Sequence, residues 1–264
     1  MATTLTPPGG LLPAQTSDLR KRAVVIGIFF LITEVAAIAG MLLRAPVASD
    51  PAYVLGAGSD MSLFLGSFFE LLLVAAVIGT AVALYPLIKK QNESVALGYV
   101  FVRFLEAVLI TVGAVSVLAV VTLRQGAEAA AGALDSGALA IVNDALVAVF
   151  DWTFILGPNL FLGLNSALLA YLMYKSGLVP RLIAQLGLVG GTLIVISGTS
   201  MLFGVYELTS SWPFIMAVPV FAWEVSFAIW LIVKGFNTLS SDAHGVELPA
   251  NETADSPTPQ PSAR

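Results

Sequence analysis

Six long runs of apolar residues follow one another along the chain. Each is long enough to cross a lipid bilayer as a helix, which takes about 20 residues at 1.5 Å each. We expect these helices at residues 23–43, 61–88, 95–123, roughly 141–174, 182–203 and 212–233. The pattern therefore predicts an all-α membrane protein, a bundle of six transmembrane helices.

The fourth run is longer than one crossing requires, and Gly157, Pro158 and Asn159 interrupt it. Proline removes a backbone donor and disturbs a regular helix. Two interpretations stay open. Either the residues before the interruption form an amphipathic extension at the membrane surface, or the interruption marks a broken-helix binding site.

The two ends of the chain differ in composition from the apolar runs, since they are rich in Pro, Ser, Thr and Gly. Segments of this kind cannot bury a core. We therefore expect a disordered N-terminal segment (1–18), a six-helix transmembrane domain (19–236) and a disordered C-terminal tail (237–264). The first apolar run exceeds the usual length of a signal-peptide core, about 7–15 residues, so we expect it to be retained as a helix.

The positions of Lys and Arg indicate the orientation in the membrane. With the N-terminus in the cytoplasm, nine of the 12 Lys and Arg residues lie inside and only Arg44 and Arg124 lie outside. Positive residues favour cytoplasmic loops. We expect a multi-pass protein of the cell (plasma) membrane with both termini cytoplasmic.

Composition agrees with this class and excludes several functions. The chain is 58% hydrophobic and 11% charged, whereas soluble proteins average about 45–50% and about 25%. Cysteine is absent and the single histidine, His244, lies in the polar tail, so disulfides, thiolate chemistry and intramembrane histidine chemistry are excluded. We expect no cofactor and no nucleic-acid partner, and an enzyme is the least favoured class.

Ionisable residues nevertheless occur in the middle of four predicted helices, and Asn165 lies near the centre of a fifth. The candidate polar cluster comprises Glu34, Glu70, Arg103, Glu106, Asn165 and Glu224. Each of the five ionisable members costs about 2.5–3.5 kcal/mol at a helix centre, or about 12–17 kcal/mol together. They are therefore expected to face the interior, where Arg103 and Glu106 are three residues apart and share one helix face.

The charges of this cluster do not balance. Four carboxylates and one guanidinium would leave a net charge of about −3 in a medium of low dielectric constant, so some glutamates are expected to stay protonated. The structural alternative is that these residues join helices without a further role, at about 0.6 kcal/mol for each interhelical hydrogen bond.

Three stretches resemble a known family. They are "RFLEAVLI" in the third helix, "LRKRAVVIGIFFLI" at the first helix, and "GLNSALLAYLMYKSGLVPRLIAQLGLVGG" between the fourth and fifth. Over roughly residues 19–236 the chain resembles the bacterial integral membrane proteins of domain-of-unknown-function family 4386. The resemblance implies a six-helix membrane protein with no established activity. The residues that match its pattern are Arg103, Glu106, Tyr174, Ser176, Gly177, Pro180 and Arg181.

Three functions remain open. The first is a proton-coupled carrier of a small solute, in which Glu34, Glu106 and Glu224 exchange protons around Arg103; helices 1–3 and 4–6 would then form an inverted repeat. The second is a non-transporting sensor or accessory protein whose polar cluster is structural. The third is a membrane enzyme acting on a lipid, although the Asp-rich loops typical of metal and phosphate chemistry are not seen. The lipid bilayer, with protons or a small solute, is the expected partner, and the sequence leaves the oligomeric state open.

Overall fold

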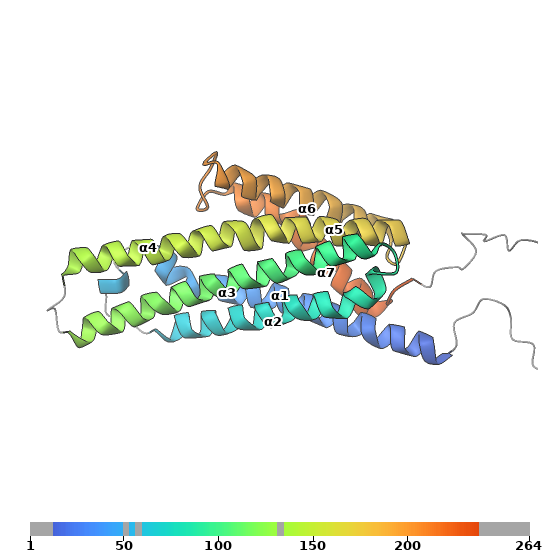
Figure 1. Ribbon diagram of the computed structural model, residues 1–264, viewed down its shortest axis with the longest axis horizontal. Coiled ribbons are helices and arrows are strands. Elements are labelled where there is room, and N and C mark those ends of the chain that lie inside the picture. The colour runs from blue at the N-terminus through green and yellow to red at the C-terminus, as the bar shows by residue number, and fades with distance from the viewer. Residues whose placement is uncertain (1–12, 50–52, 56–59, 131–134, 238–264) are drawn as a thin grey trace, which may run out of the picture.

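The computed structural model describes residues 13–49, 53–55, 60–130 and 135–237, and every regular element in these ranges is helical (Figure 1). The elements in chain order are α1 (Pro13–Ser49), η1 (Tyr53–Leu55), α2 (Met61–Ile88), α3 (Glu93–Ala129), α4 (Ser136–Phe154), η2 (Ile155–Phe161), α5 (Leu162–Ser176), α6 (Arg181–Leu202) and α7 (Trp212–Val233).

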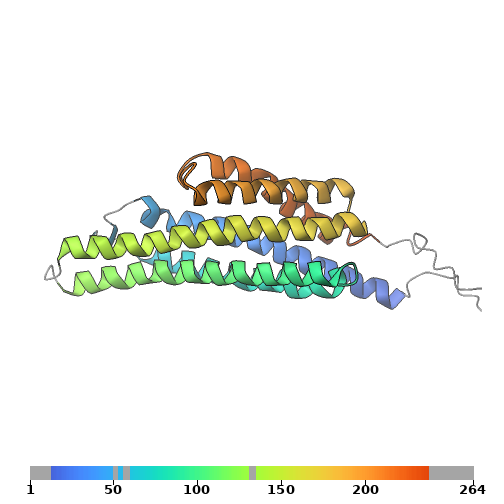
Figure 2. The same cartoon turned by 45° about the horizontal axis from the view of Figure 1, so that its top comes forward.

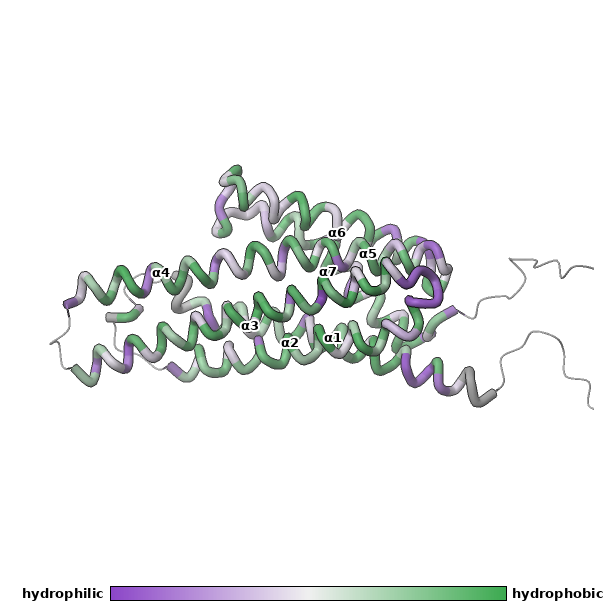
Figure 3. The backbone as a smooth tube through the Cα atoms, viewed as in Figure 1, coloured by the Kyte–Doolittle hydropathy of each residue, from purple (hydrophilic) through white to green (hydrophobic). Residues whose placement is uncertain are grey.

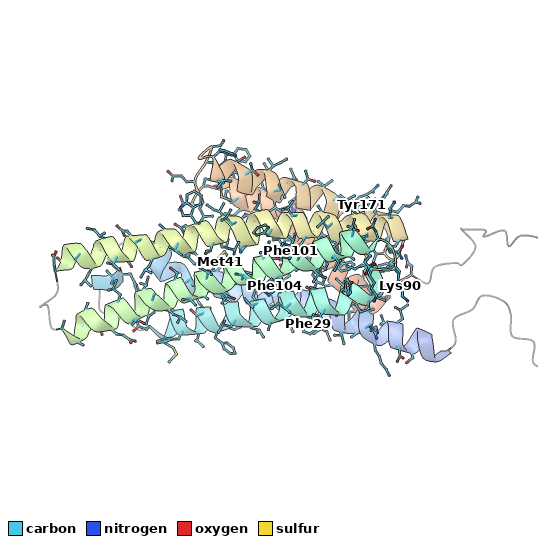
Figure 4. All side chains as sticks on the ribbon, in the orientation of Figure 1. Phe29, Met41, Lys90, Phe101, Phe104 and Tyr171 are labelled. Carbon is cyan, nitrogen blue, oxygen red and sulfur yellow. The ribbon has the colours of Figure 1, made fainter. Side chains whose placement is uncertain are left out.

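Six helical stretches are long and apolar enough to cross a membrane, and α4, η2 and α5 together form the fourth of them, Ser136–Ser176. The prediction of an all-α protein with six such helices is therefore confirmed. The large apolar side chains that remain exposed on the helices, such as Phe101 and Phe104 on α3 (Figure 4), provide the surface that lipid covers. Hydrophobic residues dominate the length of the bundle, while hydrophilic residues gather where the chain enters and leaves it (Figure 3).

The helices form a closed ring in chain order. Each spanning stretch packs against the next, α3 also contacts α5 and η2, and α1 contacts α7 to close the ring. Because the number of crossings is even, α1 begins and α7 ends at the same end of the bundle, which we call the terminus end (Figures 1 and 2). The other end, where α3 is followed by α4, we call the opposite end.

Close helix contacts depend on small residues, as the four-residue spacing of Gly187 and Gly191 predicts. A Cβ atom on Gly191 would lie 2.8 Å from the backbone nitrogen of Ala167 in α5. A Cβ atom on Gly187 would lie 2.5 Å from the ring of Trp223 in α7. These glycines therefore allow α6 to lie directly against both neighbours.

The spanning helices differ in length. The 22 residues of α6 extend about 33 Å, whereas the 41 residues of Ser136–Ser176 extend about 60 Å. The additional turns of α3 and α4 lie at the opposite end, beyond the hairpin of α6 and α7 (Figures 1 and 2). The residues before the interruption thus continue the fourth helix past α6 and α7, and the interruption is a π-helical segment, η2, that contains Pro158.

Some predicted boundaries need correction. Residues 13–18, expected in the disordered segment, are the first turns of α1. Asn237, expected at the start of the disordered tail, binds the turn after α5: its backbone nitrogen donates to the carbonyl of Leu178 at 2.8 Å, and its side chain donates to the carbonyl of Gly177 at 2.9 Å. The rest of the two predicted disordered segments, 1–12 and 238–264, lies outside the described residues.

Candidate functional site

Arg103 is the centre of a charged cluster inside the bundle. It lies on α3, is 1% exposed, and binds two carboxylates from different helices. Its Nη1 atom is 3.1 Å from Oε2 of Glu106, one turn along α3. Its Nη2 atom is 3.1 Å from Oε1 of Glu224 on α7. One guanidinium therefore joins α3 to α7 across the ring.

Asn165 and Glu34 complete the cluster from two further helices. The Asn165 side chain, fully buried on α5, donates from Nδ2 to Oε2 of Glu106 at 2.6 Å. Glu34 on α1 is partly buried, and its carboxyl group lies close enough to that of Glu224 for the two to share a hydrogen bond. We refer to Glu34, Arg103, Glu106, Asn165 and Glu224 as the central cluster.

The central cluster lies near the middle of the shortest spanning helices. Asn165 stands between Gly163 and Ala167, whose backbones meet Gly191, half-way along α6. This placement agrees with the depth expected from the sequence. Intramembrane charges at such a depth need internal partners because lipid supplies none.

Aromatic rings cover the central cluster on the side of the terminus end. The Arg103 guanidinium lies 5.4 Å from the centre of the Phe30 ring. Phe30 packs edge-on against Phe227 at 5.2 Å, and Trp223 stacks on Phe227 at 4.8 Å. These rings belong to a large apolar core, in which Ile26, Leu84 and Leu231 are fully buried. In the half of the bundle nearer the termini, the interior around Arg103 is therefore mainly apolar, with the hydroxyls of Tyr99 and Thr80 buried within it.

Glu70 does not join the central cluster. It forms an ion pair with Arg44 of α1, and the Arg44 guanidinium lies 4.5 Å from the centre of the Phe150 ring on α4. Both Arg44 and Glu70 are buried. The sequence ended the first helix at residue 43, one residue before Arg44, but α1 continues to Ser49. The predicted helix end was therefore wrong, and Ala36, Gly40 and Arg44 share a four-residue spacing that continues one helix face.

A third charged group lies at the opposite end. Arg124 on α3 is 1% exposed, and its Nη1 atom is 2.7 Å from Oδ1 of Asp60. The same atom donates to the hydroxyl of Tyr53 at 2.8 Å. Burial, and after it the hydrogen bond to Asp60, raises the pKa of the Tyr53 hydroxyl. Arg124 thus connects α3 with the segment between α1 and α2.

Sequence reasoning missed two neighbours of Arg103. Tyr99 precedes Arg103 by one turn of α3 and is fully buried, and it lies close enough to the guanidinium to interact with it. The four-residue spacing of Tyr99 and Arg103 places them on one helix face, so this contact could have been predicted from the sequence. Phe30 has the same spacing from Glu34 on α1, but nothing in the sequence shows which ring faces Arg103. Within the described ranges, no group of three or more His, Cys, Asp or Glu residues is arranged to hold a metal ion.

Six apolar spanning helices with buried, paired charges define a polytopic integral membrane protein. The family described as "Domain of unknown function (DUF4386)" matches residues 25–235, and the chain belongs to this family. The resemblance seen in the sequence is thereby confirmed. Neither the curated proteins nor the solved structures contain a match to the chain.

Proposed function

We propose that this protein is a proton-coupled carrier of a small solute, and that the central cluster is its proton-exchanging site. The observation that carries the proposal is that three carboxyl groups from three helices meet around one guanidinium: Glu106 from α3 and Glu224 from α7 bind Arg103 directly, and Glu34 from α1 lies beside Glu224.

The net charge of the central cluster favours a bound proton. If all three carboxyl groups were ionised, the buried site would carry two uncompensated negative charges. The cost of each charge at this depth, about 2.5–3.5 kcal/mol on the insertion scale, favours a protonated carboxyl instead. The pair Glu34 and Glu224 is the natural place for that proton, because two carboxyl groups share a hydrogen bond only when one of them is protonated.

The position of the cluster supports coupling between a proton and a movement of helices. Arg103 binds Glu106 on its own helix and Glu224 on α7, so it joins the first half of the ring to the second. Deprotonation of Glu34 or Glu224 would change the attraction between Arg103 and α7. A carrier alternates between two conformations, and an interhelical contact whose strength depends on protonation can shift the balance between them.

We extend the proposal to the orientation. Arg20, Lys21, Arg22, Lys89, Lys90, Lys175, Arg181 and Lys234 belong to the terminus end of the bundle, where Figure 4 labels Lys90. Arg44 and Arg124 are buried in ion pairs, so neither is a free loop charge. The terminus end therefore fits the cytoplasmic side of the cell membrane.

The proposal is tested with the full chain in liposomes that contain a pH-sensitive dye. A panel of small solutes is added outside under a proton gradient, and solute-dependent proton movement is recorded. We expect at least one solute to drive proton flux, and Glu34→Gln and Glu224→Gln to abolish it. Glu93→Gln is the matched control, because Glu93 is exposed at the start of α3. A solute that is transported equally well by all four proteins would refute proton coupling at this site.

A non-transporting sensor or accessory protein is the second candidate. The observation that favours it is that the cavity beside Arg44 and Glu70 and the open hollow between α3 and α4 are both lined by residues other than Arg103, Glu34, Glu106 and Glu224. In that case the central cluster is a joint between helices, and the Gln variants would change stability without changing any flux.

A further inference from the structure

A small cavity lies between the two intramembrane ion-pair sites. Its volume is about 60 Å³, which is room for about two to four water molecules. It is bounded by α1, α2, α3, α4 and η2. Its lining residues include Ala37, Arg44, Glu70, Ile110, Gly113 and Pro158.

The cavity adjoins the central cluster at one end. Ala37 follows Glu34 by three residues on α1, and Ile110 follows Glu106 by four residues on α3. Each of these lining residues therefore lies about one helical turn, roughly 5 Å along the helix axis, from a glutamate of the cluster. At the other end the cavity is lined by Arg44 and Glu70, which form their own ion pair.

Two polar atoms of that ion pair are left without a partner. Nε of Arg44 and Oε2 of Glu70 are buried and make no hydrogen bond to any described residue. One is a donor and the other an acceptor, and both residues line the cavity. Buried polar atoms are rarely left unsatisfied, and a water molecule can satisfy a donor and an acceptor together.

The segment η2, which contributes Pro158 to the lining of the cavity, is not a regular α-helix. Pro158 has no backbone donor, and the π-helical turn Ile155–Phe161 replaces the regular helix. The side chain of Asn159 donates to the carbonyl of Phe154 at 3.1 Å and so replaces a backbone bond. Widened turns of this kind occur often at functional sites.

We propose that this cavity is a water-binding chamber that connects the opposite end of the bundle with the central cluster, and that it serves as the proton route to Glu34 and Glu106. The role as a proton route rests on the proposed function, whereas the presence of bound water does not. The other side of the cluster is closed by the apolar core around Phe30 and Phe227. On that side of Arg103 the interior is mainly apolar, and the hydroxyls of Tyr99 and Thr80 are buried in it.

The chain contains no cysteine, so one introduced thiol reports on one position. The test uses the full chain carrying Ala37→Cys in liposomes. Silver ions are added for a set time to react with the thiol. The protein is then denatured, and the thiol that has not reacted is quantified with a maleimide. Ala37 is itself exposed on α1, so Ala75→Cys, which is exposed on α2, is the control matched for exposure, and Ala81→Cys, buried in the apolar core, is the second control. We expect Ala37→Cys to react at least about tenfold faster than both, because a thiol ionises next to water and not in apolar surroundings.

A second measurement needs no substitution. Hydroxyl radicals produced by radiolysis oxidise side chains that lie next to bound water, and mass spectrometry locates the products. Ile110 lines the chamber and Ile194 lies in the apolar core, and both are buried. We expect oxidation of Ile110 to exceed that of Ile194 severalfold.

The outcomes separate the chamber from the proposed function. Equal rates for Ala37→Cys and Ala75→Cys, together with equal oxidation of the two isoleucines, would overturn the chamber even if the Gln variants of the central cluster abolish proton flux. Rapid reaction at Ala37→Cys without any proton flux would keep the hydrated chamber and overturn its role as a proton route.

Discussion

At the scale of single residues, the central fact is that one arginine serves several acids. The sequence predicted the contact between Arg103 and Glu106 from their spacing, because residues three apart share a helix face. It also placed Glu34, Glu224 and Asn165 at a common depth. It could not separate Glu70 from this group, since depth along a helix does not show which neighbour a side chain faces, and Arg44 was expected just beyond the end of the first helix.

The first prediction concerns Arg103. Arg103→Leu leaves Glu106 and Glu224 without their cation, so we expect the free energy of unfolding to fall by about 3–5 kcal/mol unless the acids take up protons. Adding Glu106→Gln should restore part of the loss. The measurement is a double-mutant cycle by unfolding in mixed detergent. Losses that simply add in the double variant would show that Arg103 and Glu106 do not interact.

The second prediction concerns the pair of Arg44 and Glu70. Glu70→Leu alone leaves a buried cation and should cost about 3–5 kcal/mol, whereas Arg44→Met with Glu70→Leu should be close to neutral. The same unfolding assay measures both. Because this pair is separate from the central cluster, its effect should add to that of Arg103→Leu within about 0.3–0.5 kcal/mol. A larger coupling would place Glu70 with Arg103 after all.

At the scale of elements, the sequence predicted the bounds of regular helices well, but it did not predict where a helix continues past a charge or changes its winding. The expected ranges 61–88 and 212–233 agree with α2 and α7, since each run carries a single charged residue inside it and is followed directly by a lysine. The first helix was ended too early at Arg44, whose charge is neutralised by Glu70 inside the bundle. Gly157 and Pro158 marked the place of η2, but whether a proline breaks, bends or widens a helix depends on its packing.

The third prediction concerns the contact between α5 and α6. Gly191→Ala places a Cβ atom 2.8 Å from backbone atoms of Gly163 and Ala167, so the helices must separate and we expect a loss of about 1–3 kcal/mol. Gly126→Ala on α3 is the control, because a Cβ there meets nothing within 4 Å. It should stabilise the protein by about 0.5–1 kcal/mol through helix propensity. Equal effects of the two variants on the unfolding midpoint would contradict close packing at Gly191.

At the scale of the whole molecule, the ring has two unlike halves along its axis. Towards the terminus end the interior is an apolar core. Towards the opposite end it contains the pairs of Arg44 with Glu70 and Arg124 with Asp60. The sequence could predict the number of crossings from their lengths, but not this asymmetry, which depends on how the side chains of different helices meet.

The fourth prediction concerns orientation. A reporter that is active only in the cytoplasm should be active when fused after Lys90, Lys175 or Lys234, and inactive when inserted within residues 49–60. The reason is the concentration of Lys and Arg at the terminus end. A second reporter, active only outside the cytoplasm, serves as the control and should give the reverse pattern. Cytoplasmic activity from the insertion at 49–60 would overturn the proposed orientation.

The central claim is that the cluster around Arg103 holds an exchangeable proton. Infrared spectroscopy of the full chain in lipid measures it directly, because a protonated carboxyl group absorbs apart from a carboxylate. We expect a protonated carboxyl at neutral pH that persists in Glu93→Gln and is lost in Glu34→Gln or Glu224→Gln. A spectrum in which the protonated band is missing from the unaltered protein, or is unchanged when Glu34, Glu106 and Glu224 are all replaced by Gln, would contradict the claim.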